Sequence, residues 1–212
     1  MGSYIILDST LFYPQGGGQP SDQGFMTTSN GDIVSIHHVK SINNEVRHYT
    51  QHPVSLIQGQ EIHCHINIEI RLKHSQLHSA GHLLSNLVEK IYPEWKAIKG
   101  HHFPGEAYVE FISSTSRTEI DLNTLNNELN QAIEASPTVE SLFIAGEQLS
   151  KYCPDLPFSI PEGEKIRLIR IGNYPFQPCG GTHLDNLSNI KSIILTKYKI
   201  KKGHLKISYG IN

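Results

Sequence analysis

The sequence has few cysteines, and those it has are not spaced for a disulfide framework. Cys64, Cys153 and Cys179 make an odd number, and no Cys-x-x-Cys pair occurs. Small domains that depend on disulfides are rich in cysteine and belong to oxidising compartments. The scarcity therefore excludes a disulfide scaffold and predicts a protein of a reducing compartment.

Long hydrophobic runs are also missing. No apolar stretch approaches the about 20 residues that a membrane-spanning helix needs, and the N-terminus lacks a basic region followed by an apolar segment. We therefore expect a cytoplasmic protein with no membrane partner, and no obligate protein partner is evident. The 38% of hydrophobic residues and 18% of charged residues are ordinary for a folded chain. A length of 212 residues allows a small domain and a larger one, which we favour over a single core.

Acidic residues are absent from the end of the chain. No Asp or Glu occurs from Asn186 to Asn212. The same stretch holds six lysines, namely Lys191, Lys197, Lys199, Lys201, Lys202 and Lys206. Because the net charge of the whole chain is −2, a nucleic acid would have to be bound by such a local patch. Two interpretations stay open, lysines that protect a sheet edge and lysines that contact phosphates.

Two pairs of possible metal ligands recur at the same spacing. His78 and His82 are four residues apart, so on a helix both imidazoles lie on one face. Cys179 and His183 are also four residues apart, in a segment whose glycines suit a tight turn. Zinc prefers four nitrogen or sulfur donors in a tetrahedron, so the sequence predicts a zinc site formed by these four residues.

The helix that carries the first pair is predicted from Arg71 to Ile91 and ends before Pro93. Its apolar arc consists of Leu77, Ala80, Leu83, Leu84, Leu87, Val88 and Ile91. His78 and His82 fall outside this arc, in a polar stripe that would be solvated if it stood alone. The downstream cysteine and histidine turn the interpretation toward metal binding.

Short alternating runs separated by turn signals occupy residues 24–70 and predict a small all-β unit. Its clearest strand is predicted from Ile62 to Ile70, with Cys64 facing a core and His63 and His65 facing solvent. A second helix is predicted over residues 118–135, capped by Thr118 or Asp121. Further strands are predicted over residues 4–8, 108–112, 139–145, 165–171, 192–199 and 205–211, and the last two form a hairpin.

Four motifs then follow one another along the chain: the glycine segment from Phe12-Tyr13-Pro14 to Gly18-Gln19, HSAGHLL, KGHHF followed by YVEF, and CGGTH. Three successive glycines alone are typical of a flexible hairpin loop, although they would also let the backbone approach a ligand. In this order, however, the motifs resemble the AlaX family of free-standing alanyl-tRNA editing proteins. They are also similar to the editing domain of alanyl-tRNA synthetase. The resemblance covers nearly the whole chain.

This resemblance implies an α+β fold. Residues 1–70 would form a small N-terminal β-barrel that carries the glycine segment. Residues 71–212 would form a zinc-containing α+β editing domain, of the type known as the second additional domain of threonyl- and alanyl-tRNA synthetases. No adenylation motif is present, so the implied activity is hydrolysis in trans of tRNA(Ala) that carries the wrong amino acid, serine first and glycine second.

The resemblance also assigns residues. Zinc would be held by His78, His82, Cys179 and His183. The residues expected to contact the substrate are Thr10, Gln15, Gly16, Gly17, Gly18, Gln19, Gly180, Gly181 and Thr182, with the Thr10 hydroxyl associated with serine preference. The residues expected to contact tRNA are Lys99, Lys191, Lys197, Lys199, Lys201 and Lys202.

The chain departs from the family just before the first helix. An Asp-Trp pair and two successive arginines are common there, whereas Asn67, Ile68, Ile70 and Arg71 occupy the corresponding positions and leave one arginine. Ile98 replaces the glutamine that precedes the Lys-Gly pair in the synthetase. These departures spare the metal ligands and bear on tRNA contact and amino-acid discrimination.

The mechanism has alternatives that the residues leave open. Zinc either lowers the pKa of a bound water toward about 7 or orients the substrate. No side-chain general base is assigned, since Ser79-Ala80-Gly81 lacks the glutamate of a His-Glu-x-x-His protease. We expect backbone N–H groups of the glycine segments to stabilise the developing oxyanion. Two other functions remain, a non-catalytic zinc-stabilised RNA-binding module and a hydrolase for another aminoacyl-tRNA.

Overall fold

A computed structural model provides the structure and describes residues 3–114, 119–135, 137–160 and 165–212. The chain divides into two compact units, Met1–His74 and Ser75–Asn212. Each unit has its own hydrophobic core. The assignment of separate roles to residues 1–70 and 71–212 stays a prediction.

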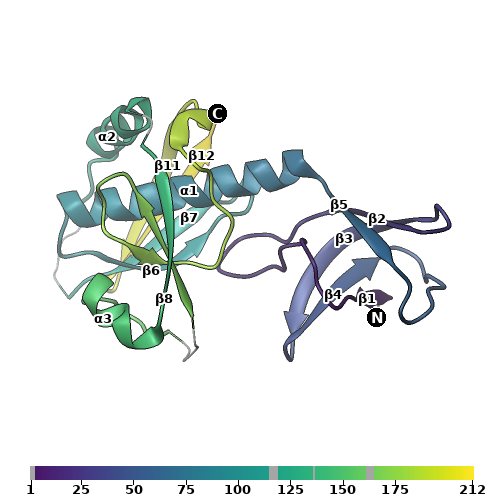
Figure 1. Ribbon diagram of the computed structural model, residues 1–212. Helices are drawn as coiled ribbons and strands as arrows, with labels where there is room; N and C mark the ends of the chain where they lie inside the picture. The colour runs from purple at the N-terminus through teal and green to yellow at the C-terminus, as the bar shows by residue number, and fades with distance from the viewer. Residues whose placement is uncertain (1–2, 115–118, 136, 161–164) are drawn as a thin grey trace. The chain divides into compact units, whose positions relative to one another are not determined.

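The first unit is built on one antiparallel sheet of five strands. These are β1 (Tyr4–Ile6), β2 (Gly24–Thr28), β3 (Ile33–Ile42), β4 (Glu45–Thr50) and β5 (Ile62–Ile66), in the order β1-β4-β3-β2-β5 (Figure 1). The core on the sheet consists of Phe12, Met26, Val34, Ile36 and Val39. Within the described residues no pairing joins the edge strands β1 and β5, so closure into a barrel stays a prediction.

The predicted strand from Ile62 to Ile70 is wrong beyond its first five residues. Strand β5 ends at Ile66, and helix α1 (Ile68–Ile91) begins two residues later. The cause lies at Asn67, whose side-chain oxygen accepts a hydrogen bond from the N–H of Ile70 at 3.1 Å and so caps the helix. The alternating isoleucines continue past this cap, which is why periodicity alone extended the strand.

The glycine segment forms a tight turn. Gly16 and Gln19 exchange backbone hydrogen bonds of 3.2 and 2.9 Å, and the two residues between them, Gly17 and Gly18, have φ of 55° and 75°. Positive φ at both central positions is typical of a type I′ turn, which glycine enters without steric cost. The turn thus commits the N–H groups of Gly16 and Gln19, while those of Gly17 and Gly18 have no partner within the described residues.

The arginine that remains before the helix braces this loop. Asp22 is fully buried, pairs with the guanidinium of Arg71 and accepts the N–H of Tyr13. Arg71 also donates to the carbonyl of Leu11 at 2.7 Å. Arg71 therefore connects the first turn of α1 to both sides of the glycine segment.

The second unit places α1 between a large sheet and a small one. The large sheet has the order β11-β12-β7-β6, from β11 (Ile193–Lys201), β12 (His204–Ile211), β7 (Tyr108–Ile112) and β6 (Lys96–His101). The small sheet has the order β10-β9-β8, from β10 (Gln177–Pro178), β9 (Ile166–Ile171) and β8 (Val139–Ile144). Helices α2 (Leu122–Glu134) and α3 (Leu149–Tyr152) and the 3₁₀ turns Gly146–Gln148 and Leu187–Asn189 complete the unit (Figure 1).

Most of the predicted elements of this unit are confirmed. The apolar arc of α1 lies in the main core, together with Val109 and Phe111 of β7 and Leu205 and Ile207 of β12. Asp121 caps α2 by accepting the N–H groups of Asn123 and Thr124, whereas Thr118 lies outside the described residues. The C-terminal hairpin turns at Lys202 and Gly203, which have φ of 50° and 75°.

Strand β6 was not predicted. Gly100 and two adjacent histidines leave this stretch without a regular apolar alternation. In the structure the strand pairs with β7 across a bulge between Ala97 and Lys99. Among the described residues no helix is long and apolar enough to cross a membrane.

Replacing Asp22 with alanine should reduce the free energy of unfolding by about 3 kcal/mol, because it removes a buried carboxylate that pairs with Arg71 and accepts the Tyr13 amide. Urea denaturation of the full chain measures the loss. The matched control is Glu45→Ala, which breaks the exposed pair with Arg47 and should cost less than about 1 kcal/mol. Equal losses in the two variants would contradict the bracing role of Asp22.

Candidate metal centre

The polar stripe of α1 is buried, not solvated. Ser75, His78 and Ser85 are at most 5% exposed. The segment after β9 covers them: Thr182 Oγ1 lies 2.7 Å from Ser75 Oγ, and the side-chain amide of Gln177 donates to Ser85 Oγ at 2.9 Å. The helix therefore has two packed faces, one apolar and one polar.

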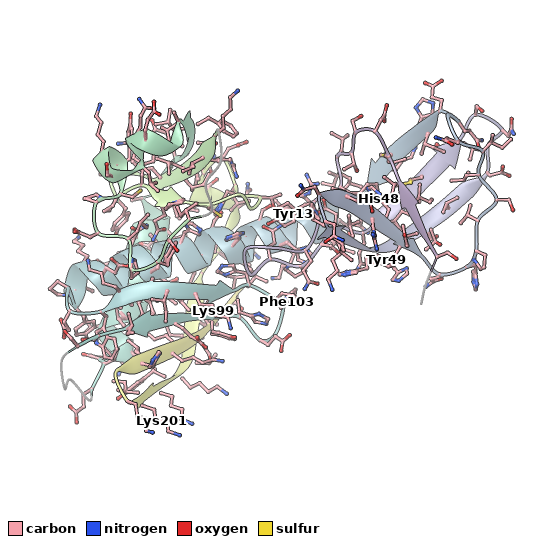
Figure 2. All side chains as sticks on the ribbon, turned by 90° about the horizontal axis from the view of Figure 1, so that it is seen from below. Tyr13, His48, Tyr49, Lys99, Phe103 and Lys201 are labelled. Carbon is pink, nitrogen blue, oxygen red and sulfur yellow. The ribbon has the colours of Figure 1, made fainter. Side chains whose placement is uncertain are left out.

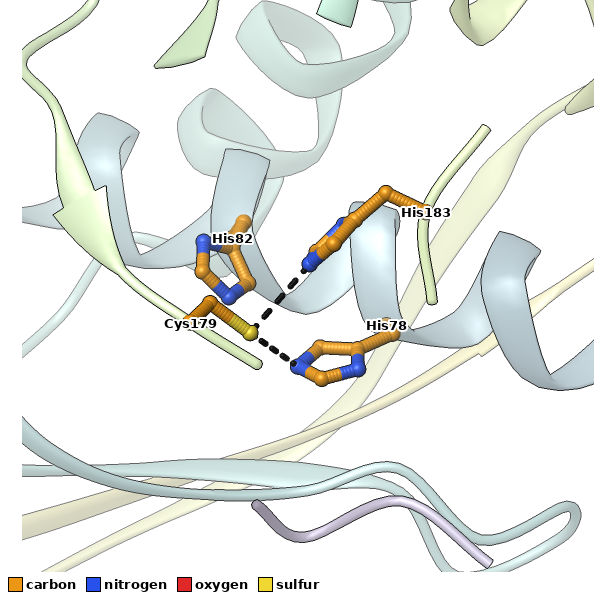
Figure 3. Close-up of side chains that lie close together, drawn as sticks. All are labelled: His78, His82, Cys179 and His183. Carbon is orange, nitrogen blue, oxygen red and sulfur yellow. Dashed lines mark hydrogen bonds between the residues drawn. The ribbon is translucent and has the colours of Figure 1, made fainter. Parts of the chain in front are cut away.

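The four predicted ligands meet on the polar face (Figure 3). One donor atom from each of His78, His82, Cys179 and His183 lies within 4.8 Å of the others. Cys179 Sγ is 3.3 Å from Nε2 of His78 and 3.3 Å from Nε2 of His183. Two histidines of one helix and two residues about a hundred positions later thus form one cluster in the second unit.

The geometry and chemistry of these donors fit zinc. Zinc bonds of about 2.0–2.1 Å to nitrogen and about 2.3 Å to sulfur place neighbouring tetrahedral donors about 3.3–3.6 Å apart. The two sulfur-to-nitrogen distances of 3.3 Å lie at this spacing. Zinc prefers nitrogen and sulfur donors, such as these three imidazoles and one thiol, whereas magnesium and calcium prefer oxygen donors.

Burial keeps the imidazoles in the form that binds metal. Desolvation, reinforced by the other histidines, holds the pKa of His78 and of His183 well below the ordinary value, and desolvation lowers the pKa of His82 to about 4. Burial raises the pKa of the Cys179 thiol, although the Gly181 amide and Arg167 oppose the change. At neutral pH the three histidines therefore offer uncharged nitrogen lone pairs, and one thiol proton must leave when metal binds.

Outer contacts hold the cluster in place. His183 Nδ1 lies 3.1 Å from Ser79 Oγ, which also accepts the N–H of Leu184 at 3.2 Å. The N–H of Gly181 donates to Cys179 Sγ at 3.3 Å. Arg167 on β9 donates to the carbonyls of Cys179 and Gly181, and the N–H of Cys179 returns a bond to the Arg167 carbonyl at 3.0 Å. Such partners orient metal ligands and tune their basicity.

Sequence reasoning missed His102 as part of this centre. Its side chain is 3% exposed, and its ring stacks on that of His78 with centroids 4.3 Å apart. Its Nδ1 lies 2.6 Å from the hydroxyl of Tyr209, which donates to the carbonyl of Leu77 at 2.8 Å. The ring occupies space that two glycines leave: a Cβ on Gly81 or on Gly100 would lie 2.4 or 2.3 Å from it. In the sequence, Gly81 and Gly100 were the signal from which the buried His102 ring could have been inferred.

The centre is partly open. His78 is buried, but His82, Cys179 and His183 are only half-buried. A pocket of about 270 Å³ lies beside Cys179 and Gly180 and is also lined by Phe158, Ile160, Lys165, Ile166, Arg167 and Pro178. The pocket gives a small molecule access to the Cys179 side of the cluster. Four protein donors fill a tetrahedral zinc shell, so binding of water or substrate to the metal would need a fifth position or a displaced ligand.

The predicted substrate-binding residues fall into two groups. Gly180 is exposed, Thr182 is half-buried and Gly181 is buried, all beside the cluster in the second unit. Thr10 and the run from Gln15 to Gln19 belong to the first unit, where Gln15, Gly16 and Gly17 are exposed and Gly18 and Thr10 half-buried. Gln19 is fully buried inside that unit.

Five lysines form a basic sheet face on the side of the large sheet away from the core: Lys99, Lys197, Lys199, Lys201 and Lys206. Lys199 pairs across the sheet with Lys206, Lys206 with Glu110, and Glu110 with Lys99, so these residues form one row. Lys191 and Lys202 are exposed at the ends of β11.

Aromatic rings accompany these lysines. The ring of His101 stacks on Phe103 and on Tyr108, with centroids 4.4 and 4.9 Å apart, and Lys206 Nζ lies 3.2 Å from the Tyr108 ring centroid. Figure 2 labels Lys99, Phe103 and Lys201 on this unit. A surface that combines cations with ring faces suits a nucleic acid, which offers phosphates and bases.

The chain matches two family models, both of which describe parts of aminoacyl-tRNA synthetases. Residues 1–70 match the class II (A) tRNA synthetases, and residues 166–206 match the second additional domain of threonyl- and alanyl-tRNA synthetases. The second match includes Cys179 and His183.

Individual relatives extend the similarity to the whole chain. The alanyl-tRNA editing protein AlaX-M of Saccharolobus solfataricus is 30% identical over 99% of this chain and 89% of its own length. The alanine–tRNA ligase of Sulfurisphaera tokodaii is 28% identical over 98% of this chain, and that of Thermococcus kodakarensis is 26% identical over 99%. The chain spans 23% of the length of each of these two ligases. It belongs to the AlaX family of alanyl-tRNA editing proteins.

Replacing Ser79 with alanine should lower zinc affinity about 10- to 100-fold, because the change removes the hydroxyl that orients His183 and leaves all four donors in place. Competition with a chromophoric chelator measures the zinc affinity. Elemental analysis of the wild-type protein should find about one zinc ion per chain. Ser35→Ala, an exposed change on β3, is the control. Unchanged affinity in Ser79→Ala would contradict the orienting role of Ser79, and zinc still bound after Cys179→Ala and His78→Ala together would refute this metal centre.

Proposed function

We propose that this protein is a trans-acting hydrolase that removes wrongly attached amino acids from tRNA(Ala), serine first and glycine second, at a zinc centre formed by His78, His82, Cys179 and His183. The observation that carries the proposal is the convergence of these four donors, half-open beside a pocket, in a member of the AlaX family. Zinc, when bound, would supply a Lewis acid for ester hydrolysis.

The reaction joins water to the ester carbonyl carbon and breaks the bond from that carbon to the ribose oxygen, which leaves with a proton. Negative charge develops on the carbonyl oxygen, so backbone N–H groups nearby would stabilise the transition state. In the second unit the N–H of Gly180, next to Cys179, has no hydrogen-bond partner within the described residues, and we assign it to the carbonyl oxygen. In the first unit the N–H groups of Gly17 and Gly18 also have no partner there, and we keep them as predicted contacts of the substrate.

Amino-acid selection is assigned to the first unit. A hydrophobic pocket cannot strongly reject serine in place of alanine, which differs by a hydroxyl, so a second hydrolytic site that reads the hydroxyl is useful. Thr10 carries the side-chain hydroxyl suited to this reading, and it is half-buried. The predicted contact segment also includes Gln15 to Gln19. The side chain of Gln19 is buried, so we assign Gln19 the role of holding the loop in place.

Binding of tRNA is assigned to the basic sheet face, with Lys191 and Lys202 at its border. Its lysines and the stacked rings of His101, Phe103 and Tyr108 match the two chemical features of an RNA end, charge and exposed bases. A non-catalytic RNA-binding module would share this face. The pocket beside Cys179 and the similarity to an alanyl-tRNA editing protein favour the hydrolase.

Incubation of the purified protein with seryl-, glycyl- and alanyl-tRNA(Ala) tests the proposal directly. We expect rapid loss of the seryl ester, slower loss of the glycyl ester and little loss of the alanyl ester. Removal of zinc by a chelator should abolish turnover, and added zinc should restore it. Binding of tRNA without ester loss would support the non-catalytic module, and full activity of protein shown to be metal-free would refute the zinc role.

The same assay tests the amide of Gly180. A Cβ at this position meets no atom within 4 Å, so Gly180→Ala should keep its activity, while Gly180→Pro removes the N–H and should lower kcat. Zinc content is measured in both variants because Cys179 is adjacent. Equal turnover in the two variants with equal zinc would exclude the amide.

Replacing Lys199 and Lys201 with alanine should raise KM for seryl-tRNA(Ala) and leave kcat unchanged. Each lost phosphate contact should also flatten the dependence of log affinity on log salt by about 0.7–0.9. Filter binding at several salt concentrations measures this slope. The control is Lys151→Ala on α3, an exposed lysine away from the basic sheet face. A slope that is the same in both variants would contradict the assignment.

A further inference from the structure

A histidine of the first unit is buried without belonging to the metal centre. His48 lies on β4, is 0% exposed and packs edge-on against Phe12 with ring centroids 5.5 Å apart (Figure 2). Each ring nitrogen has one partner. Nδ1 lies 3.0 Å from the carbonyl oxygen of Ile5, and Nε2 lies 2.8 Å from Thr10 Oγ1.

The first of these contacts fixes where the ring proton sits. A carbonyl oxygen can only accept, so Nδ1 must carry the proton that lies between His48 and Ile5. Burial lowers the pKa of His48, and a neutral imidazole has a single N–H. Nε2 is therefore a bare nitrogen and acts as an acceptor.

The unprotonated Nε2 in turn fixes the direction in which the Thr10 hydroxyl donates its proton. Because Nε2 can only accept, the hydroxyl must donate its one proton to it. The N–H of Phe12 donates to the same oxygen at 3.1 Å and occupies one of its lone pairs. These are the contacts of this hydroxyl among the described residues, so Thr10 keeps one lone pair and no proton to give.

We propose that His48 is a positioning residue that makes Thr10 an obligatory hydrogen-bond acceptor, and that the glycine segment thereby selects amino acids whose side chain carries a hydroxyl donor. This inference rests on the proposed function and names the chemistry by which serine is read. A serine hydroxyl satisfies the Thr10 lone pair, whereas alanine and glycine have no donor to offer. A freely rotating threonine would lose this polarity, since it could donate as well as accept.

The test is a double-mutant cycle with wild type, Thr10→Val, His48→Leu and the double variant. The readout is the ratio of kcat/KM for seryl-tRNA(Ala) to that for glycyl-tRNA(Ala). Each single change should lower the ratio about 3- to 10-fold, the value of one neutral hydrogen bond. If His48 acts through Thr10, adding His48→Leu to Thr10→Val should lower the ratio no further.

Two further variants separate positioning from packing. His48→Gln can place an amide oxygen near the position of Nε2 and should keep more of the ratio than His48→Leu. His38→Leu is the matched control, because His38 on β3 forms a similar contact, from Nδ1 to Ser21 Oγ at 3.1 Å, with no connection to Thr10. The ratio in His38→Leu should equal that of wild type.

Different results would refute different statements. Equal losses of activity on both substrates in His48→Leu, or additive effects in the cycle, would reduce His48 to a structural role and overturn the inference alone. A wild-type protein that hydrolyses neither substrate would overturn the proposed function and the inference with it. If His48→Leu does not fold, long-range ¹H–¹⁵N spectra of wild type decide, since a proton on Nε2 of His48 instead of Nδ1 contradicts the proposal.

Discussion

The structure depends on covering the polar stripe of α1. A helix with imidazoles and hydroxyls on one side and leucines on the other would normally leave the polar side in water. Here the segment from Gln177 to His183 lies over it, and four of its side chains meet side chains of the helix: Gln177, Cys179, Thr182 and His183. Burying polar groups costs free energy unless they are paired. Hydrogen bonds as well as apolar contacts therefore hold the small sheet against α1.

The same burial that costs stability prepares the site. Burial keeps the imidazoles uncharged, so their nitrogen lone pairs are free to bind a cation. Burial also raises the pKa of the Cys179 thiol, so the thiol would lose its proton when a metal ion binds. Arg167 anchors the loop by donating to the carbonyls of Cys179 and Gly181, and neither carbonyl is one of the metal-donor atoms. The ring of His102 occupies the space beside Gly81 and Gly100 and stacks on the ring of His78.

Periodicity was sufficient for helix α1 apart from its first three residues, and spacing was sufficient for the convergence of the four predicted ligands. The arc from Leu77 to Ile91 and the four-residue intervals at His78 and Cys179 are local patterns, and local geometry fixes what they do. The strand from Ile62 to Ile70 and the missed β6 show the limit of such patterns. An asparagine cap overrode alternation in the first case, and in the second pairing with β7 made a strand of residues that have no strand pattern of their own. His102 was missed because its partner Tyr209 lies more than a hundred residues later, and Gly81 and Gly100 were its one local signal.

Hydroxyl–imidazole pairs occur in both units, and their polarity is opposite for a physical reason. In the proposed zinc centre of the second unit His183 would present Nε2 to the metal, so its proton would belong on Nδ1 and Ser79 Oγ would accept it. In the first unit His48 gives its Nδ1 proton to the Ile5 carbonyl, so Nε2 accepts and Thr10 Oγ1 becomes the donor. The partner of the second nitrogen decides which way each hydroxyl points. A motif search finds the same two residue types in both cases. Under the two proposals the third atom distinguishes them, because a metal on Nε2 would make the hydroxyl hold a ligand and a backbone carbonyl on Nδ1 would make it read a substrate.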